Sequence, residues 1–545
     1  MHGQYRIGRT VRRLGAGAVL LAGCAGPRVC LPPGHLPAAA PPPDVQTAGA
    51  LVTAADGPTP AQTLSKEVKP DQPKGGRPPF ELPRGLPGVP AQPFAPPRFQ
   101  PNTPLAEREK AVAAAYPAVT PVAGTAEVAD AQPLSLADLQ RMAAETSPVL
   151  RRATAAAEAA FGPVVQAGLY PNPTVGYQGD QIQPRLNVPP GATFSGAGQQ
   201  GGFVNQLIKT AGKLSLAQAV AGFDYLNAVV AVRRAEVDVT NAVRTQYFAV
   251  LVARQAVEVN RTLTELTDEV YRLQLRQVVA GEAAGYEPLL LYAQAEQARN
   301  ALAQAEATAR AAWRQLAAAV GRPDLPPAPL TGRADAPAPV FDLDRLRARI
   351  LEQHTDLLTA RNTVTQAEVN LRLQRRLVIP DLTTNQYHQY DNAAQTYQFG
   401  LQFGVSLPVF DRNQGNIRQA AAQIGRATAD LTATQNDLQG RLAEAIGRYE
   451  ASRVNAARYR EKVIPSLSQA YRAIIRRYQA EPEKVGFNDI VVAQQNLATV
   501  LQAYLAALNA QWQAVVDVAT LGQLDDLYPP EPAPESPAIP DATPK

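Results

Sequence analysis

Residue types that commonly carry chemistry are scarce in this chain of 545 residues. It has two cysteines, Cys24 and Cys30, and four histidines: His2, His35, His354 and His388. No histidine has the spacing to a cysteine or to another histidine that a metal site requires. The sequence also lacks a Gly-rich phosphate loop and a nucleophile elbow. We therefore expect no enzyme, no metal site and no cofactor, and Cys24 is the residue whose surroundings indicate a reaction.

Cys24 ends the sequence Leu21-Ala22-Gly23-Cys24, which follows a basic segment and an apolar run from 14 to 21. The run is far shorter than the roughly 20 residues of a membrane-spanning helix, and this order of basic, apolar and small residues is typical of a secretory signal. The tetrapeptide resembles the bacterial lipobox, which implies removal of residues 1–23 and acylation of the Cys24 thiolate. The same resemblance implies that Ala25 after the cysteine, in place of Asp, favours the outer membrane over retention in the inner membrane. The alternative is an exported disulfide between Cys24 and Cys30.

The charge balance argues against a nucleic-acid partner. The chain has 52 basic and 48 acidic residues, and four of the basic ones are Arg6, Arg9, Arg12 and Arg13 of the signal. Removing them leaves 52 − 4 = 48 basic residues against 48 acidic ones, so the mature chain would be neutral. A nucleic-acid-binding surface normally shows as a basic excess.

Two terminal segments have the composition of unstructured chain. Residues 24–130 are dense in Pro, Ala and Gly, and residues 528–545 have the same character. Such segments have too little patterned apolar surface to offset the entropy lost on ordering. We expect a disordered tether and a disordered tail, with the folded part between them.

The folded part contains an internal duplication. Leu136, Leu139, Glu145 and Leu150 match Leu343, Leu346, Glu352 and Leu357 at one constant offset. Each half predicts a helix of about 35 residues (135–168 and 343–377), a strand hairpin, a long helical stretch, a Gly-containing break and another helix of about 35 residues. The repeats are expected at 134–325 and 340–525.

The clearest strand signal lies in the second repeat. From Tyr397 to Leu407, apolar residues alternate with Gln, Gly and Ser over about 11 residues, as a strand between lipid and water requires. Its expected partner is 383–390, and the first hairpin is expected at 174–180 with 199–207. The alternation also fits a half-buried strand of a soluble sheet, but four short strands would make a very small one.

The long helical stretches are expected at 214–279 and 417–480. About 60 residues at 1.5 Å each reach about 90 Å, near the depth of a periplasm. Leu431, Leu438, Leu442 and Ile446 follow one face of the second stretch, which indicates packing in a helix bundle or coiled coil. Pro465 should kink or interrupt this stretch.

A distinctive motif follows the alternating strand. Pro408 ends strand pairing, Phe410 suits a membrane interface, and the polar run that follows offers turn and N-cap chemistry. The motif residues are Pro408, Phe410, Asp411, Arg412, Asn413, Gln414, Gly415 and Asn416. This segment, the duplicated halves and Tyr170-Pro171-Asn172-Pro173 resemble the TolC-like outer-membrane factors, the outer membrane efflux protein family, in the lipoprotein branch of RND-type systems.

The resemblance implies a mainly α fold with a small membrane β-barrel contribution. A homotrimer would form one twelve-stranded β-barrel, continued by a long α-helical barrel across the periplasm. Its function would be that of a passive outer-membrane exit channel. It would export small molecules or metal cations delivered by an inner-membrane pump, with an RND-type pump favoured, through a periplasmic adaptor protein. We expect outer-membrane lipid around it and no nucleic acid.

The two Gly-containing breaks would then be periplasmic tips that meet the adaptor or gate the tunnel. The candidate residues are Gly281, Glu282, Gly285, Glu287, Glu481, Glu483, Gly486, Phe487 and Asp489. Their carboxylates could form rings in a trimer that bind cations. The alternative is that they are solvated residues in loops and first helical turns.

Three other functions remain open from the sequence. A lipid-anchored periplasmic adaptor would have one helical hairpin, and the duplication argues against it. A coiled-coil scaffold without a pore would require the strand signals to be accidental. An outlet for type I protein secretion shares the expected fold.

Overall fold

The computed structural model describes residues 94–100, 102–121, 132–182, 198–481 and 486–528. All of them belong to one compact unit, Gln92–Lys545. The expectations for the signal, for Cys24 and its lipobox, for the first part of the tether and for the tail from 529 lie outside the described residues.

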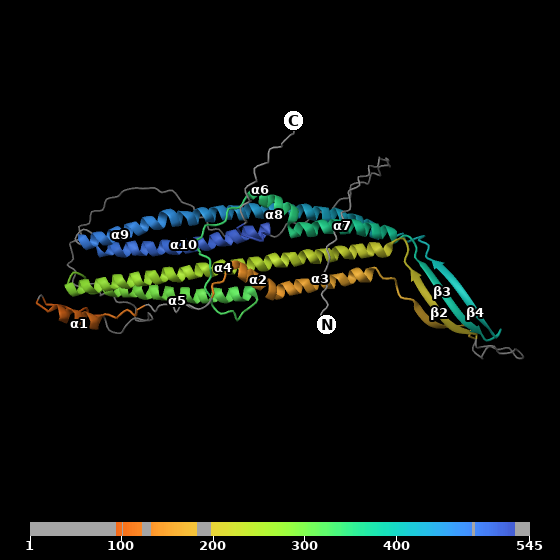
Figure 1. Cartoon of the computed structure of the whole chain (residues 1–545), viewed down its shortest axis with the longest axis horizontal. Coiled ribbons are helices and arrows are strands. Elements are labelled where there is room, and N and C mark those ends of the chain that lie inside the picture. The colour runs from red at the N-terminus through yellow and green to blue at the C-terminus, as the bar shows by residue number, and fades with distance from the viewer. Residues whose placement is uncertain (1–93, 101, 122–131, 183–197, 482–485, 529–545) are drawn as a thin grey trace, which may run out of the picture. The chain divides into compact units, whose positions relative to one another are not determined.

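The two repeats contain the same order of elements (Figure 1). The first has α2 (Leu136–Thr146), α3 (Pro148–Ala167), β1 (Thr174–Asp180), β2 (Gln199–Ile208), α4 (Lys213–Ala280) and α5 (Glu287–Val320). The second has α6 (Leu343–Gln353), α7 (Thr355–Arg376), β3 (Leu382–Asp391), β4 (Thr396–Val405), α8 (Gln414–Arg458), a π-helical turn (Tyr459–Val463), α9 (Ile464–Ala480) and α10 (Phe487–Gly522). The expected duplicated, mainly α fold with a small β contribution is confirmed.

Two predicted helices are each split in two. In the first repeat Ser147 is extended, with φ −59° and ψ 122°, because the ring of the following Pro148 disfavours a helical conformation there. In the second repeat His354 takes the same place, and its Nδ1 accepts a hydrogen bond of 3.2 Å from the amide of Asp356. The predictions of single helices over 135–168 and 343–377 were therefore wrong, since each segment contains an internal helix start.

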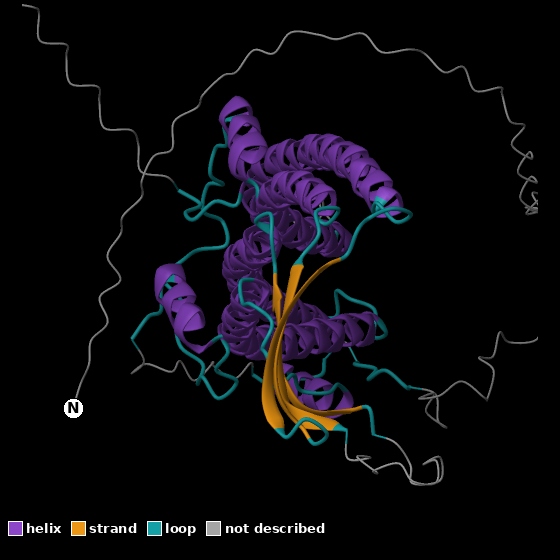
Figure 2. Cartoon of the chain, turned by 90° about the vertical axis from the view of Figure 1, so that its right-hand side faces the viewer, coloured by secondary structure: helices purple, strands orange, loops and turns teal. Residues whose placement is uncertain are grey.

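The four strands form one antiparallel sheet in the order β1-β2-β3-β4, at one end of the helices (Figure 2). Both predicted hairpins are present within two residues of their expected ends. The central pair, β2 with β3, joins the two repeats, with Gln199 opposite Asp391 and Ile208 opposite Leu382.

Two glycines make room for aromatic rings on one face of this sheet. A Cβ on Gly176 would lie 2.5 Å from the Phe203 ring, and one on Gly400 would lie 1.9 Å from the Tyr387 ring. A ring that packs over a glycine on the adjacent strand needs the missing side chain as space. These positions therefore require glycine.

The long helices lie side by side, and the two halves differ in one respect. In the first repeat α4 is continuous over 68 residues. In the second, a π-helical turn separates α8 from α9 just before Pro465. Proline cannot donate the backbone hydrogen bond of an α-helix, and π-helical turns re-space such bonds. The interruption expected at Pro465 takes this form.

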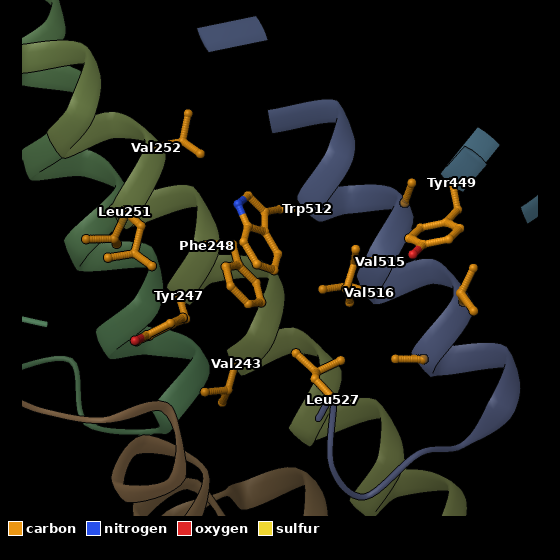
Figure 3. Packing of buried hydrophobic residues seen from close by; sticks show 14 of the residues in the cluster. Val243, Tyr247, Phe248, Leu251, Val252, Tyr449, Trp512, Val515, Val516 and Leu527 are labelled. Atoms are coloured by element: carbon orange, nitrogen blue, oxygen red, sulfur yellow. The ribbon is translucent and has the colours of Figure 1, made fainter. Parts of the chain in front are cut away.

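The main core packs helices of both repeats against each other and includes residues of the loop between the repeats. Figure 3 shows the part of this core that α4, α8 and α10 form. Trp512 of α10 stacks on Phe248 of α4, with ring centroids 3.9 Å apart and planes 6° apart. Its indole N–H donates to the carbonyl of Ala334 at 2.7 Å. The hydroxyl of Tyr449 in α8 donates to the carbonyl of Pro339. The buried polar groups of Trp512 and Tyr449 thus both find a partner in the connecting loop.

Among the described residues, α4 alone has the length and apolar composition to cross a membrane. One 18-residue window of it has a mean hydropathy of 1.3, and none of that window is buried. This is weak evidence for a membrane helix, because packing faces of bundle helices meet the same criteria.

Candidate functional site: sheet faces, strand-to-helix junction and helix tips

One face of the sheet presents apolar side chains to the outside. Tyr397, Phe399 and Phe403 of β4 are 73%, 70% and 62% exposed. The strand register places Tyr177 of β1 and Phe399 on this same face, through Gly202 and His388. A contiguous exposed apolar face of this kind marks a surface that meets lipid or protein.

The opposite face carries a polar network across all four strands. Two carboxylates, Asp180 and Asp391, accept hydrogen bonds from glutamine side chains of β1, β2, β3 and β4. The donors are Gln178 (2.7 Å) and Gln389 (3.2 Å) to Asp180, and Gln199 and Gln398 (both 3.1 Å) to Asp391. The sheet therefore has one face suited to lipid and one suited to water.

Both outer edges of this sheet lack a strand partner within the described residues. The order β1-β2-β3-β4 leaves the far sides of β1 and β4 unpaired. Unpaired backbone groups at such an edge are costly in a bilayer and are a template for pairing with another chain. Both edges are therefore available for pairing with further strands.

The motif after β4 forms a tight turn that fixes the start of α8. Asn413 occupies the N-cap position in a left-handed conformation, with φ 56°. Its amide donates to Oδ1 of Asp411 at 2.8 Å, and Nδ2 donates to the carbonyl of Gln374 in α7 at 2.8 Å. Its side chain makes no cap hydrogen bond to α8. Asn413 therefore joins α7 and α8.

The remaining motif residues support this turn or face outward. The amide of Arg412 donates to Oε1 of Gln414 at 2.8 Å, and Nδ2 of Asn416 donates to Oδ1 of Asn413 at 2.6 Å. Phe410 is 92% exposed. Pro408 follows the end of β4, and Gly415 lies in the first turn of α8.

The first tip connects α4 to α5. Gly281 ends α4 with φ 85°, a value that favours glycine. Glu282 is exposed. Glu287, in the first turn of α5, accepts a hydrogen bond from the side chain of Gln274. Gly285 is covered, because its carbonyl accepts a hydrogen bond of 2.6 Å from the Tyr116 hydroxyl.

Tyr116, which covers Gly285, belongs to a segment that the sequence predicted to be part of the disordered tether. Residues 94–121, apart from 101, are described and contain α1 (Leu105–Ala115). The expectation of a structureless tether over 24–130 has to be corrected for these residues. A local signal was present: Pro104 precedes a run of good helix formers, and Val112 and Tyr116 share one helix face.

The second tip is described on both sides of a gap. The amide of Gly486 donates to Oδ2 of Asp489 at 3.0 Å, so this carboxylate caps the start of α10. Phe487 meets Tyr478 edge-on, with centroids 6.3 Å apart. Oε2 of Glu481 lies 3.8 Å from Nε of Arg477. Glu483 lies outside the described residues.

No group of three or more His, Cys, Asp or Glu able to hold a metal ion occurs in the described part of the chain. His354 is buried at the start of α7, and His388 stacks on Tyr397 in the sheet, with ring centroids 5.4 Å apart. His354 therefore caps a helix and His388 packs on an aromatic ring.

Together, the two-faced sheet and the paired long helices define a subunit of a β-barrel continued by a helical tunnel. Comparison with known proteins agrees. Residues 139–322 match the family model described as outer membrane efflux protein, which confirms the predicted family resemblance for this part of the chain.

One curated relative is the cobalt-zinc-cadmium resistance protein CzcC of Cupriavidus metallidurans, 25% identical over 281 residues. The alignment covers 52% of this chain and 66% of CzcC, just under two thirds of that protein.

Solved structures with the same fold include the channel CusC, with a TM-score of 0.60 and 16% identity over 71% of this chain and 91% of CusC. A membrane protein from Pseudomonas aeruginosa has a TM-score of 0.60 and 18% identity, over 74% of this chain and 99% of its own. The outer membrane protein VceC of Vibrio cholerae has a TM-score of 0.58 and 17% identity, over 71% and 96% respectively.

Proposed function

We propose that this protein is a passive outer-membrane exit channel of a tripartite efflux system and not an enzyme. The observation that carries the proposal is the four-stranded sheet with an apolar outer face, a polar inner face and two open edges. Such a sheet is incomplete in a monomer. It becomes stable in a bilayer when it closes into a barrel.

Closure by identical copies follows from the strand order. When β4 of one copy pairs with β1 of the next, the contact is head-to-tail, and a head-to-tail contact forms a ring if its rotation closes. Three copies of four strands give 3 × 4 = 12 strands. In that ring the Asp180 and Asp391 network faces the water-filled lumen, while Phe399 and Phe403 face lipid.

The helices supply the periplasmic part of the path. The 68 residues of α4 span about 100 Å at 1.5 Å per residue. The tips therefore lie at the far end from the sheet, where a periplasmic adaptor and an inner-membrane pump, with the RND type favoured, would deliver cargo and energy. Acylation of Cys24 would add a lipid anchor at the outer membrane.

The cargo is proposed to be small molecules or metal cations. The similarity to a cobalt-zinc-cadmium resistance protein supports cations. The two lumen-facing carboxylates per protomer also suit a cation path, because fixed negative charge in a pore lowers the energy of a passing cation.

The test is to measure single-channel conductance in a planar bilayer together with the native mass of the same detergent-purified sample. Discrete openings from a species of three chains would support the channel. A monomer that never conducts would contradict it and would leave the adaptor or scaffold as the better explanation.

A further inference from the structure

The segment before the first repeat packs against the first tip. This tip lies at the end of α4 that is remote from the sheet. We call residues 94–121, apart from 101, the N-terminal strap. α1 of the strap contacts the end of α4, and Figure 1 shows it beside the ends of α4 and α5.

The strap is held first by apolar packing. Val112 and Tyr116 are 3% and 4% exposed and form a cluster with Val278 of α4. Several partly buried residues complete it: Phe99, Ala115, Leu275, Val279, Ala283 and Leu289. Side chains from the strap, α4, the tip turn and α5 thus share one small core.

Three hydrogen bonds join the strap to the tip turn, to α4 and to α5. The Tyr116 hydroxyl donates to the carbonyl of Gly285 in the turn at 2.6 Å. The Tyr271 hydroxyl of α4 donates to the carbonyl of Pro117 at 2.8 Å. Arg299 of α5 donates to the carbonyl of Thr120 at 2.9 Å.

The tip sequence is adapted to the strap at Gly285. A Cβ at this position would lie 2.2 Å from Cβ of Pro96, a distance that real Cβ atoms essentially never show. Gly285 has no positive φ that would require glycine. The close approach of the strap therefore explains the glycine.

The strap also reaches the junction between the two helical hairpins. Val119 packs against a cluster that contains Tyr271 of α4, Leu291 of α5, Tyr471 of α9 and Ile490 of α10. Arg299, which binds Thr120, also donates to the buried carboxylate of Asp268 in α4 at 2.8 Å. The same arginine thus links α4, α5 and the strap.

We propose that the N-terminal strap is a permanently bound part of the first tip and that, with Cys24 acylated, the N-terminal region ties the membrane to this tip. The second half of the proposal rests on the proposed function, which puts the lipid at the sheet end. A partner protein that approaches the first tip then meets α1, with exposed Glu107, Glu109 and Lys110, before it meets Gly285.

The length of the intervening chain fits this tie. Residues 25–93 number 69, and at about 3.5 Å per extended residue they reach at most about 240 Å. The distance to be spanned is the length of α4, about 100 Å. The chain before the strap is therefore long enough.

Hydrogen exchange of the full-length protein, followed by mass spectrometry, tests the docking. We expect protection of α1 and of 275–280, and at least tenfold faster exchange in both segments in Tyr116→Ala. Tyr286→Ala is the matched control, because Tyr286 lies in the same tip but is 63% exposed. Exchange of α1 at the rate of an unstructured peptide in the wild type, or equal effects of the two variants, would overturn the docking.

Shortening the chain tests the tie. Deletion of residues 35–79 leaves 69 − 45 = 24 residues between Cys24 and Phe94, at most about 85 Å and too short to span α4. We expect it to abolish protection of α1, and we expect Cys24→Ser in the same deletion to restore it. Deletion of residues 35–54 leaves 49 residues, about 170 Å, and should leave protection unchanged.

Unchanged protection in the long deletion, in a sample whose Cys24 is acylated by intact mass, would overturn the tie. Conductance of the same preparations tests the channel separately. A conducting trimer with an unprotected strap contradicts the strap alone, and a protected strap in a protein that never conducts contradicts the channel alone.

Discussion

The carboxylate of Asp381, the residue before β3, lies 2.7 Å from Nζ of Lys213, the first residue of α4. The oxygen that faces Lys213, Oδ1, also accepts a hydrogen bond of 3.0 Å from the amide of Thr210, and the other oxygen, Oδ2, lies 3.0 Å from Nζ of Lys209. Because α4 belongs to the first repeat and Asp381 to the second, this cluster fastens the two repeats together where the helices meet the sheet.

Asp381→Asn should destabilise the protein in a pH-dependent way. Burial alone would raise the pKa of Asp381, but hydrogen bonds from Lys213, Thr210 and Lys209 lower it to about 2. A carboxylate with a depressed pKa in the folded state stabilises above its unfolded pKa of about 4, and this contribution is lost as the pH falls toward 2. The difference between a pKa of about 2 in the folded protein and about 4 in the unfolded chain corresponds to about 2.5 kcal/mol of stability at pH 7.

Unfolding in detergent, followed by circular dichroism at pH 7 and pH 2.5, measures this effect. The difference between wild type and Asp381→Asn should be large at pH 7 and small at pH 2.5. Asp430→Asn, which removes an exposed pair with Arg426 at 3.6 Å, should change little at either pH. A constant difference between wild type and Asp381→Asn at both values would contradict the electrostatic explanation.

An arginine should affect trimer assembly differently at two adjacent positions of β4. Phe403 lies on the apolar face and Gln402 on the polar face. Arg on a lipid face costs about 2–4 kcal/mol at the bilayer midplane, whereas a lumen residue mainly changes selectivity. Phe403→Arg should therefore reduce trimer in the outer-membrane fraction, while Gln402→Arg should assemble and conduct with lower cation preference.

The quantities to measure are trimer yield and the reversal potential in a salt gradient. If the two substitutions reduced trimer yield equally, the assignment of faces to lipid and lumen would be wrong. This pair is informative because both residues belong to one strand and receive the same side chain.

The turn at Asn413 should tolerate glycine better than alanine. A non-glycine residue with positive φ costs roughly 1–2 kcal/mol, and Asn413→Gly avoids that cost while losing the hydrogen bond to Gln374. Asn413→Ala suffers both losses. We expect stability in the order wild type, glycine, alanine, measured as the midpoint of thermal unfolding, and a more stable alanine variant would contradict the left-handed turn.

Acylation of Cys24 can be tested directly. Intact mass of protein from membranes should show removal of residues 1–23 and an added lipid, and Cys24→Ser should lose the lipid and retain its signal. The Cys30→Ser variant should be acylated normally. A mass that corresponds to an unmodified Cys24–Cys30 disulfide would support the alternative predicted from the sequence.

The sequence alone determined the elements and their duplication. Strand positions such as Tyr397–Leu407, the ends of α4 and the interruption at Pro465 follow from local periodicity and from proline chemistry, which act within a few residues. Even the division at Ser147 was readable from the following Pro148, although a single helix was predicted there. These features depend on neighbours in the chain.

Only the tertiary structure decided which distant residues meet. The pairing of β2 with β3, the contact of Asp381 with Lys213 and the docking of Tyr116 on Gly285 join residues separated by more than 160 positions. Composition placed the strap in the tether because its few apolar side chains cannot form a core by themselves. They become buried because α4 and α5 supply the rest of the surface, and no local pattern in the strap encodes that surface.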